Sequence, residues 1–381
     1  MLPKPGKNHQ IPINFRPISL LKCIGKLFEK ILSTRLIQIL ENQNFFNKWQ
    51  RAYLSKKETT EHIFRLGTHA NHAIAKKHFT AAILLDVEKA FDSVWHNSLK
   101  HKLSNLNLPP YLTTILSSFL DSRTIKVKSA NEISQQVKLA AGTPQGSVLS
   151  PILFIIYVND IPSNPQNKTY ISQFADDLGL WTSDKNPNYV QIKLQRALKE
   201  LETWCAKWHV KLNPTKTQLL PITKGTRTIK LQLYNTPIET AHEAKLLGVT
   251  FDKNMNLKAH TKNLVQKSNQ RISLVRRLKC TNMGTNPETI IKLYKAYIRP
   301  ILEIGAVLTA DKPLRLAELQ IIQNKLIRIA YKLPRTIPIP KLHEISKLEL
   351  LTERLPTLKT KSIERFKNSD LMIELEQYLL T

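Results

Sequence analysis

Two adjacent carboxylates interrupt a mostly apolar stretch of the chain and limit how that stretch can fold. Asp176 and Asp177 follow Phe174 and Ala175 inside segment 170–181. A carboxylate pair in such surroundings is costly unless a positive charge neutralises it. The segment therefore predicts a β-hairpin that carries Ala-Asp-Asp at its tip, next to a cation.

A second apolar run upstream also ends in a carboxylate. Residues 81–85 are all apolar, and Asp86 follows them. If these strand ends lie side by side in one sheet, the carboxylates form a hard oxygen cage that Mg²⁺ accepts while keeping water and phosphate ligands. Taken alone, an Asp-Asp pair is as well explained by an ordinary turn.

The charge of the chain predicts a polyanionic partner. Lys and Arg number 57 against 29 Asp and Glu, which leaves +28 and a pI near 10.0. A merely solubilising surface is the alternative, but the excess is uneven, because residues 1–28 and 253–281 contain no acid. The second of these segments predicts a helical surface that binds phosphates, through Lys253, Lys258, Lys262, Lys267, Arg271, Arg276 and Arg277.

The hydrophobic pattern predicts an α+β sheet domain followed by an all-helical region. Apolar residues at three- and four-residue steps give segment 18–40 one buried helical face, from Leu20 and Ile24 onward. The other expected helices are 59–77, 112–120, 151–160 and 190–210; the expected strands and hairpins are 81–86, 124–140, 170–181, 211–221 and 246–251; helices follow Asp252.

The remaining composition predicts a soluble intracellular protein with no membrane segment. Cys23, Cys205 and Cys280 lie far apart and form no metal or disulfide motif, which favours reduced thiols. The longest unbroken apolar run, 152–158, is too short to cross a bilayer. The N-terminus does not read as a signal peptide.

Five motifs in order resemble the reverse transcriptase domain of non-LTR retrotransposons, most of all the jockey type. Each is weak alone, and together they span about residues 3–252. They are Asn-Phe-Arg-Pro-Ile-Ser-Leu-Leu (14–21), Asp-Val-Glu-Lys-Ala-Phe-Asp-Ser-Val-Trp-His (86–96), Gly-Thr-Pro-Gln-Gly-Ser-Val-Leu-Ser-Pro (142–151), Phe-Ala-Asp-Asp (174–177) and Leu-Leu-Gly-Val-Thr-Phe-Asp (246–252). Segments 293–302 and 319–328 resemble the helices that follow the polymerase in those elements.

The resemblance implies a right-hand polymerase with a ferredoxin-like palm sheet. Residues 1–80 would be the fingers, with 121–145 shared between fingers and palm. Residues 81–252 would be the palm with the catalytic carboxylates and the primer grip at 246–252. Residues 253–381 would be a helical thumb and C-terminal extension.

The resemblance also assigns the chemistry of the carboxylates. Two Mg²⁺ ions, or Mn²⁺ in their place, serve both ends of a nucleotidyl transfer. By resemblance Asp86 and Asp176 bridge both ions, and Asp177 is the third acidic member. Lys216 stands where the family places a lysine near the pyrophosphate, as a candidate general acid.

Four residues are implied to contact the incoming deoxynucleotide. Arg16 would contact the triphosphate, helped by Lys4 or Lys7, and Phe91 would be the steric gate against a ribose 2′-hydroxyl. Gln145 and Gly146 lie in a turn whose glycines would let the backbone approach the nucleotide. The plain alternatives are a core phenylalanine and an ordinary turn, and Asp92 is expected to cap a helix starting there.

The chain differs from the family in two ways, and a group of its histidines raises the question of a zinc site. The family commonly has Gln-x-Gly-Phe-Arg where this chain has Gln50-Arg-Ala-Tyr-Leu, so one fingers contact is expected to be missing or moved. The chain begins at the first polymerase motif, so an endonuclease in trans is expected. The histidines have no companions for a zinc site, and a solvated helix face is expected of His62, His69, His72 and His78.

The expected function is an RNA-directed DNA polymerase that extends a DNA primer on an RNA template with dNTPs. A relic that binds nucleic acid without catalysis is the main alternative. An intron-encoded maturase and a viral RNA-dependent RNA polymerase are further alternatives. Ala-Asp-Asp and Gly-Thr-Pro-Gln-Gly count against the viral enzyme, and the motif at 86–96 counts against the maturase.

Overall fold

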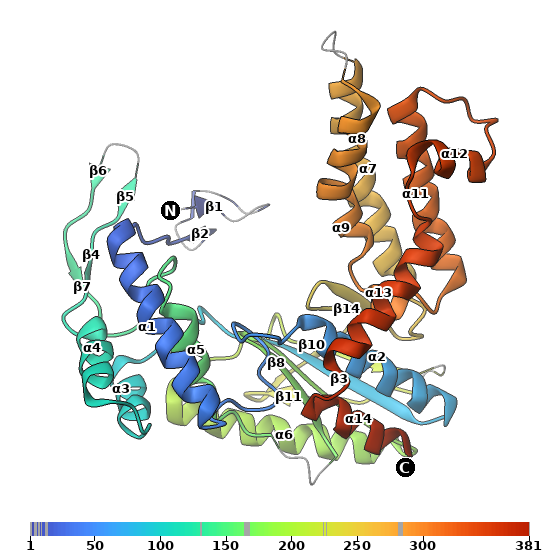
Figure 1. Cartoon of the computed structure of the whole chain (residues 1–381). Helices are drawn as coiled ribbons and strands as arrows, with labels where there is room; N and C mark the ends of the chain where they lie inside the picture. The colour runs from blue at the N-terminus through green and yellow to red at the C-terminus, as the bar shows by residue number, and fades with distance from the viewer. Residues whose placement is uncertain are drawn as a thin grey trace.

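A five-stranded sheet forms the centre of the molecule, and two helical arms rise from it on opposite sides (Figure 1). This computed structural model describes residues 2–380 apart from 4, 5, 7, 9, 12, 13, 130, 131, 164–167, 224, 226 and 281–284. Lys4 and Lys7, which are expected to help Arg16 contact the triphosphate, lie outside the described residues.

The strand order in the sheet is β13-β10-β3-β9-β8, with β3 in the middle. β3 pairs antiparallel with both β9 and β10, and the β8–β9 hairpin forms one edge. The bounds are β3 Phe79–Asp86, β8 Tyr170–Phe174, β9 Asp177–Asp184, β10 Gln218–Ile222 and β13 Glu239–Thr240. The strands and the hairpin expected at 81–86 and 170–181 are confirmed.

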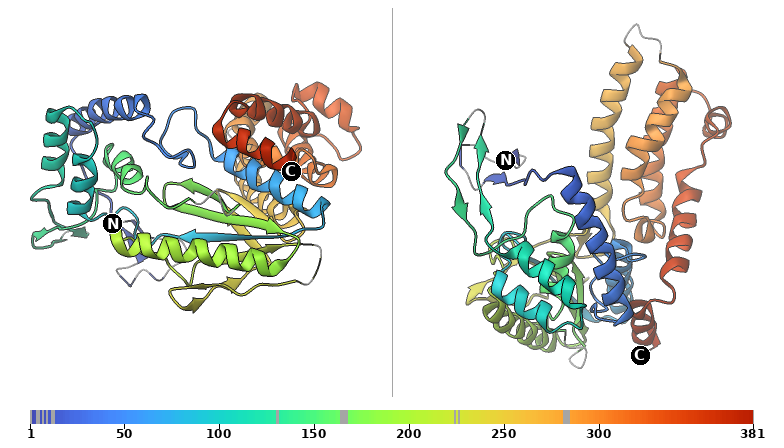
Figure 2. Two further views of the ribbon diagram at one scale, coloured as in Figure 1. Left: turned by 90° about the horizontal axis from the view of Figure 1, so that it is seen from below. Right: turned by 60° about the vertical axis from the view of Figure 1, so that its left-hand side comes forward.

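The two faces of the sheet pack against different elements because successive side chains of β3 point to opposite sides. Ala81, Ile83 and Leu85 join a core with α5 (Ser150–Tyr157) and α6 (Pro187–Trp208). Ala82 joins a second core with α2 (Thr59–Ala75) and the β14–β15 hairpin (Glu243–Leu246, Val249–Asp252). In the view from below, α6 lies along the sheet (Figure 2).

One arm contains α1 and the segment between β3 and α5. It comprises α1 (Cys23–Asn42), α3 (His96–Ser104), α4 (Pro110–Leu120) and a ribbon of four short strands, β4 Thr124–Ile125, β5 Lys128–Ser129, β6 Glu132–Ile133 and β7 Val137–Lys138. The short ribbon β1 (Leu2–Pro3) and β2 (Phe15–Arg16) lies beside α1. Pattern alone did not predict α3.

The buried face expected for segment 18–40 is wrong in its first half. Leu20 and Ile24 are 91% and 83% exposed, and Leu27, Phe28 and Ile31 are also exposed. Only the second half of α1 packs into the core, through Leu32, Leu36 and Leu40. The reason is that the first turns of α1 extend beyond the edge of the sheet, where no described element covers them.

The second arm is built from the helices that follow β15, as expected. They are α7 (Lys258–Cys280), α8 (Pro287–Leu293), a π-helix (Tyr294–Ile298), α9 (Arg299–Leu302), α10 (Ala306–Thr309), α11 (Pro313–Tyr331), α12 (Ile339–Ser346) and α13 (Leu351–Phe366). The chain then returns to the sheet as α14 (Asp370–Leu380), which packs on α2. No helix among the described residues is long and apolar enough to span a membrane.

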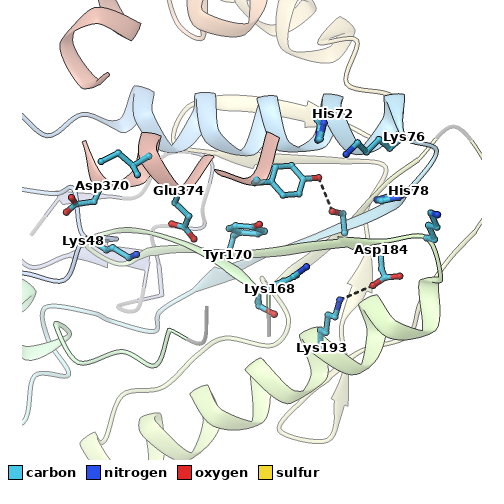
Figure 3. Close-up of a pocket in the computed structure, with 15 residues that line it drawn as sticks. Lys48, His72, Lys76, His78, Lys168, Tyr170, Asp184, Lys193, Asp370 and Glu374 are labelled. Carbon is cyan, nitrogen blue, oxygen red and sulfur yellow. Dashed lines mark hydrogen bonds and ion pairs between the residues drawn. The ribbon is translucent and has the colours of Figure 1, made fainter. Parts of the chain in front are cut away.

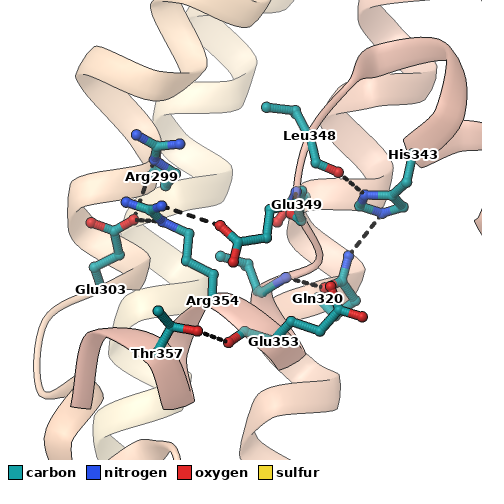
Figure 4. Close-up of polar contacts among 11 residues, drawn as sticks. Arg299, Glu303, Gln320, His343, Leu348, Glu349, Glu353, Arg354 and Thr357 are labelled. Atoms are coloured by element: carbon teal, nitrogen blue, oxygen red, sulfur yellow. Dashed lines mark hydrogen bonds and ion pairs between the residues drawn. The ribbon is translucent and has the colours of Figure 1, made fainter. Parts of the chain in front are cut away.

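Ion pairs hold the second arm together where α9 and α13 meet (Figure 4). The Arg354 guanidinium contacts Glu303 at 2.6 Å and Glu349 at 3.3 Å, and Arg299 contacts Glu303 at 3.2 Å. Beside them, His343 Nδ1 donates to the Leu348 carbonyl at 2.8 Å. These contacts fasten the base of the arm with charged groups that are only partly exposed.

A buried carboxylate joins the first arm to the central core. Glu29 of α1 is 8% exposed, and its Oε2 accepts from the Ser147 hydroxyl at 2.7 Å and from the Val148 amide at 2.6 Å. Both donors lie just before the first turn of α5, where free amides and the helix dipole favour a negative charge. The Ser147 hydroxyl itself accepts from the Leu149 and Ser150 amides at 3.1 and 3.3 Å, so Glu29 reinforces this local cap and fixes the position of α1 on α5.

We expect Glu29→Ala to lower the free energy of unfolding by about 2 kcal/mol, because charge-assisted hydrogen bonds at buried donors are lost. Urea unfolding followed by circular dichroism measures this change. The matched control is Glu41→Ala on the same helix, which loses one exposed hydrogen bond to Ser55 and should change stability by less than about 0.5 kcal/mol. Equal effects of the two substitutions would contradict the role of Glu29.

Candidate active site

The antiparallel pairing of β3 with β9 brings the three expected carboxylates to one end of the sheet. Asp86, the last residue of β3, lies directly opposite Asp177, the first residue of β9. Asp176 precedes it in the tight turn of the β8–β9 hairpin, where Ala175 has φ of 55°. The side chains of Asp176 and Asp177 are exposed at this tip.

The negative charges of the three carboxylates repel one another. The pKa of Asp176 is raised by partial desolvation and then by the charge of Asp86. The pKa of Asp177 is raised by desolvation and by both Asp176 and Asp86, while Lys245 acts in the opposite direction. The cluster therefore favours protons or a cation over three free negative charges.

Lys216, the candidate general acid, lies at the cluster. Its ammonium donates to Asp86 Oδ2 at 2.9 Å. The loop that carries it is tied to the same strand end, because the Asn213 amide donates to the Asp86 carbonyl at 2.8 Å. Asn213 Oδ1 in turn accepts from the Thr215 amide at 3.1 Å and the Lys216 amide at 3.3 Å. Asn213 is a positioning residue that pattern reasoning missed.

The donor set suits a hard divalent cation, although its side chains are not gathered around one point. Within the described ranges, no three acidic, histidine or cysteine side chains converge closely enough to hold a metal ion, and one oxygen of Asp86 is engaged by Lys216. Three mutually repelling carboxylates at adjoining strand ends nevertheless provide the oxygen ligands that Mg²⁺ prefers. Binding such an ion would require these side chains to reorient.

The segment that departs from the family motif packs directly on the hairpin. Gln50 is fully buried, and its Oε1 accepts from the amides of Ala52 at 2.8 Å and Ala175 at 3.2 Å. The Tyr53 hydroxyl has a raised pKa because of burial and then the charge of Asp176, which places this ring near the cluster. Gln50 thus fixes the turn that carries the carboxylates.

The turn at 142–146 lies against the segment that follows β3. The Phe91 carbonyl accepts from the Thr143 amide at 2.8 Å. The Phe91 ring is half-buried, and its centre lies 5.0 Å from the centre of the Phe154 ring. Gln145 Nε2 donates to Asp92 Oδ1 at 3.0 Å. The cap expected of Asp92 is wrong, because the next helix begins only at His96.

Both glycines of this turn have close neighbours within the protein itself. Gly142 has φ of 91°, and a Cβ there would lie 3.0 Å from the Asp92 carbonyl oxygen. Gly146 has φ of 110°, and a Cβ there would lie 3.2 Å from the Ser19 carbonyl oxygen. Both φ values and both contacts favour glycine, so intramolecular packing alone accounts for the two residues.

The other expected binding residues lie on separate elements. Arg16 is exposed on β2. On α7, Lys258, Lys262, Lys267, Arg276 and Arg277 are exposed, whereas Lys253 precedes the helix and is partly exposed. Arg271 is partly exposed, and its guanidinium lies 4.1 Å from the centre of the Tyr297 ring, so this residue stabilises the arm.

The expectation of solvated histidines is wrong for two of the four. His62 and His69 are buried, and burial lowers the pKa of each to about 3. His62 Nε2 lies 3.2 Å from the Gln173 carbonyl, and His69 Nε2 lies 3.0 Å from the Ser183 hydroxyl. Both rings are therefore neutral at neutral pH and join α2 to the β8–β9 hairpin.

Comparison with known proteins gives one family match and several similar proteins. The family model described as reverse transcriptase (RNA-dependent DNA polymerase) matches residues 2–251. The probable RNA-directed DNA polymerase from transposon BS of Drosophila melanogaster is 30% identical over 369 residues, covering 93% of this chain and 40% of that protein. The RNA-directed DNA polymerase from mobile element jockey of the same species is 27% identical over 373 residues, covering 96% and 41%.

The similarity covers a minority of each relative. A third, the probable RNA-directed DNA polymerase from transposon X-element of Drosophila melanogaster, is 28% identical and covers 86% of this chain and 37% of that protein. The chain thus spans about two fifths of the length of the curated relatives it matches. Among solved structures, apo telomerase from Candida tropicalis aligns with a TM-score of 0.44 and 13% identity over 92% of this chain and 60% of that one. This overlap is too loose to establish a shared fold.

The raised pKa values of Asp176 and Asp177 predict how stability depends on pH. When folding raises the pKa of a carboxyl group, the free energy of unfolding of the protein falls as the pH rises from the ordinary pKa to the raised value. Asp176→Asn should therefore be more stable than the natural chain at about pH 7 without divalent cations, and the difference should shrink below about pH 4. Urea unfolding at the two pH values measures both differences.

Asp184, at the other end of β9, is the matched control. Burial would raise its pKa, but hydrogen bonds from Lys193 and the Asn186 amide outweigh burial and lower the pKa. Asp184→Asn should accordingly reduce stability at about pH 7. If Asp176→Asn also reduces stability there, the repulsion assigned to the cluster is contradicted.

Proposed function

The chain belongs to the reverse transcriptase (RNA-dependent DNA polymerase) family, and we propose that it is the polymerase portion of a non-LTR retrotransposon protein. In this role it extends a DNA 3′-end along an RNA template with deoxynucleoside triphosphates. The observation that carries the proposal is the in-register pairing of Asp86 with Asp177, next to Asp176 in the hairpin turn. Two of the similar proteins are named as RNA-directed DNA polymerases of mobile elements, transposon BS and jockey, and these names support the same assignment.

The carboxylates would hold two Mg²⁺ ions, with Mn²⁺ as a substitute. Asp86, Asp176 and Asp177 would be the ligands, with Asp177 the more peripheral of the three. When bound, such ions supply charge that stabilises the attacking and leaving oxygens of an in-line displacement. The mutual repulsion among the carboxylates supports this assignment, because a cation relieves it.

Lys216 is proposed to act on the leaving pyrophosphate. Its ammonium already lies within hydrogen-bond distance of Asp86 and is held there by the loop that Asn213 anchors. The Lys216 ammonium would turn from Asp86 toward a bound triphosphate and donate a proton to the pyrophosphate oxygen as its bond to the α-phosphorus breaks. The flexible stem of a lysine allows this change of partner.

The parts of a right-hand polymerase are proposed to follow the arms. Residues 1–80 with part of 121–145 would be the fingers, 81–252 the palm, and 253–381 the thumb and C-terminal extension. The order β10-β3-β9-β8 supports a ferredoxin-like palm, since it is the order of a split βαβ unit. The two arms on opposite sides of the sheet support the placement of fingers and thumb (Figure 2).

The substrate contacts remain proposals. Phe91 would exclude ribonucleotides, and Gln145, Gly146 and Arg16 would contact the incoming nucleotide. The hydrogen bonds that join the 142–146 turn to residues 91 and 92 support a single nucleotide-facing unit. The exposed bases of α7 would bind the template–primer duplex, and an endonuclease activity would supply the nicked DNA end in target-primed reverse transcription.

We expect the purified chain to extend a DNA primer on an RNA template in Mg²⁺, and Asp176→Asn to abolish extension. Loss of a metal-binding carboxylate removes transition-state stabilisation rather than folding, so the variant should keep its circular dichroism spectrum and its affinity for duplex. Primer extension resolved on a denaturing gel measures the activity. Duplex binding without extension in Mg²⁺ or Mn²⁺ would instead establish the non-catalytic relic.

Lys216→Ala should lower kcat on the order of 10²-fold, because a positioned proton donor is removed. The matched control is Lys211→Ala in the same loop. The Lys211 side chain is exposed, and its ammonium lies 3.6 Å from the Glu88 carboxylate. Single-turnover nucleotide incorporation should leave the control within about twofold of the natural chain. A Lys216→Ala rate as fast as that of the control would remove Lys216 from the mechanism.

A further inference from the structure

A basic groove lies at the end of the sheet opposite to the carboxylates (Figure 3). Its volume is about 840 Å³, within the range of ligand pockets. The pairs Asp86 with Asp177 and Phe79 with Asp184 mark the two ends of the β3–β9 ladder. Seven residue steps at about 3.3 Å each separate them by about 23 Å, so the end of the groove at Asp184 lies far from the carboxylate site.

Helices α2, α6 and α14 and strands β8 and β9 contribute to the walls of the groove. The end of α2 contributes His72, β8 contributes Tyr170, α6 contributes Lys193, and α14 contributes Tyr378. The returning helix α14 is fastened there, because Arg65 contacts Glu374 at 3.0 Å and the Tyr378 ring stacks on His69 at 3.9 Å. The groove is therefore built by long-range packing.

Positive charge is concentrated at one end of the groove. This basic end consists of His72, Lys76, His78, Lys168, Lys185 and Lys193, with Asp184 as its one lining acid among the described residues. Asp184 pairs with Lys193 at 2.9 Å. At the other end the acids are Asp370 and Glu374, and Glu374 is engaged by Arg65.

The surroundings of His72 at this end disfavour a positive charge on its ring. The pKa of His72 is lowered by desolvation and then by the charges of Lys76 and His78. His72 Nδ1 and the hydroxyl of Thr169 are buried and have no hydrogen-bond partner in the described part of the chain. A multivalent anion in the groove would neutralise the charges of the exposed lysines at this end.

We propose that this groove is a second nucleic-acid site, which binds a single strand of RNA through its phosphate backbone. Phosphate-tracking grooves in single-strand binding proteins combine lysines with aromatic walls, as Tyr170 and Tyr378 do here. The volume of this groove, about 840 Å³, suits a short stretch of a single strand. The choice of RNA rests on the proposed function, since a polymerase of this kind must hold a long template outside its catalytic site.

The test measures binding of a short fluorescent single-stranded RNA to the full chain by anisotropy. An unlabelled RNA–DNA hybrid at saturating concentration occupies the polymerase site, and no nucleotide is added. Lys76→Glu combined with Lys185→Glu should weaken the remaining binding by roughly tenfold or more and reduce the salt dependence by about one to two released ions. The matched control combines Lys230→Glu with Lys341→Glu, two exposed lysines outside the groove, and should change affinity less than about twofold.

Two results would overturn the proposal. Equal weakening by the groove pair and the control pair would mean diffuse attraction to a chain of net charge +28. Complete displacement of the RNA by the hybrid would mean a single site.

Hydrogen exchange on the natural chain removes any dependence on how the variants fold. Adding the RNA with the hybrid present should protect backbone amides at 72–78 and 183–185, and unchanged exchange there would also overturn the proposal. Because no nucleotide is consumed, a chain that fails to extend primers still gives a clear answer about the groove.

Discussion

The eight residue pairs between β3 and β9 are the constraint on which the rest of the structure depends. Their register sets Asp86 against Asp177 and sends Ala81, Ile83 and Leu85 into one core while Ala82 enters the other. A slip of one residue would exchange the two faces and separate the carboxylates, so folding and catalysis select the same register. Gln50 contacts the β8–β9 turn and Asn213 contacts the end of β3. These contacts hold the segments around the carboxylates only in that register.

Sequence reasoning succeeded where the signal is local. An apolar run that ends in Asp86 and an apolar hairpin that carries Asp176 predict their own strands and the places where those strands end. It failed where a residue depends on a distant partner. Glu29 contacts residues about 118 positions away, Gln50 contacts the hairpin about 125 positions away, and His69 is covered by α14 near the end of the chain. The early turns of α1 have a helical apolar pattern yet no covering element.

Charge is arranged along the sheet in a way that suits a long polyanion. The carboxylates occupy one end of the β3–β9 ladder, the basic groove occupies the other, and the exposed bases of α7 stand on the second arm. Negative charge at the carboxylate end attracts cations, and a phosphate backbone would then meet positive charge on either side of them. The return of α14 to the sheet makes the basic groove depend on the same C-terminal region that forms the second arm.

Anomalous diffraction from crystals soaked with Mn²⁺ and a non-hydrolysable deoxynucleoside triphosphate tests the central claim most directly. The account predicts Mn²⁺ peaks at coordination distance, about 2 Å, from Asp86 and Asp176, with the Lys216 ammonium moved from Asp86 to the triphosphate. Peaks elsewhere, or none, with Lys216 still on Asp86, would contradict the assignment of this strand end as the site of nucleotidyl transfer.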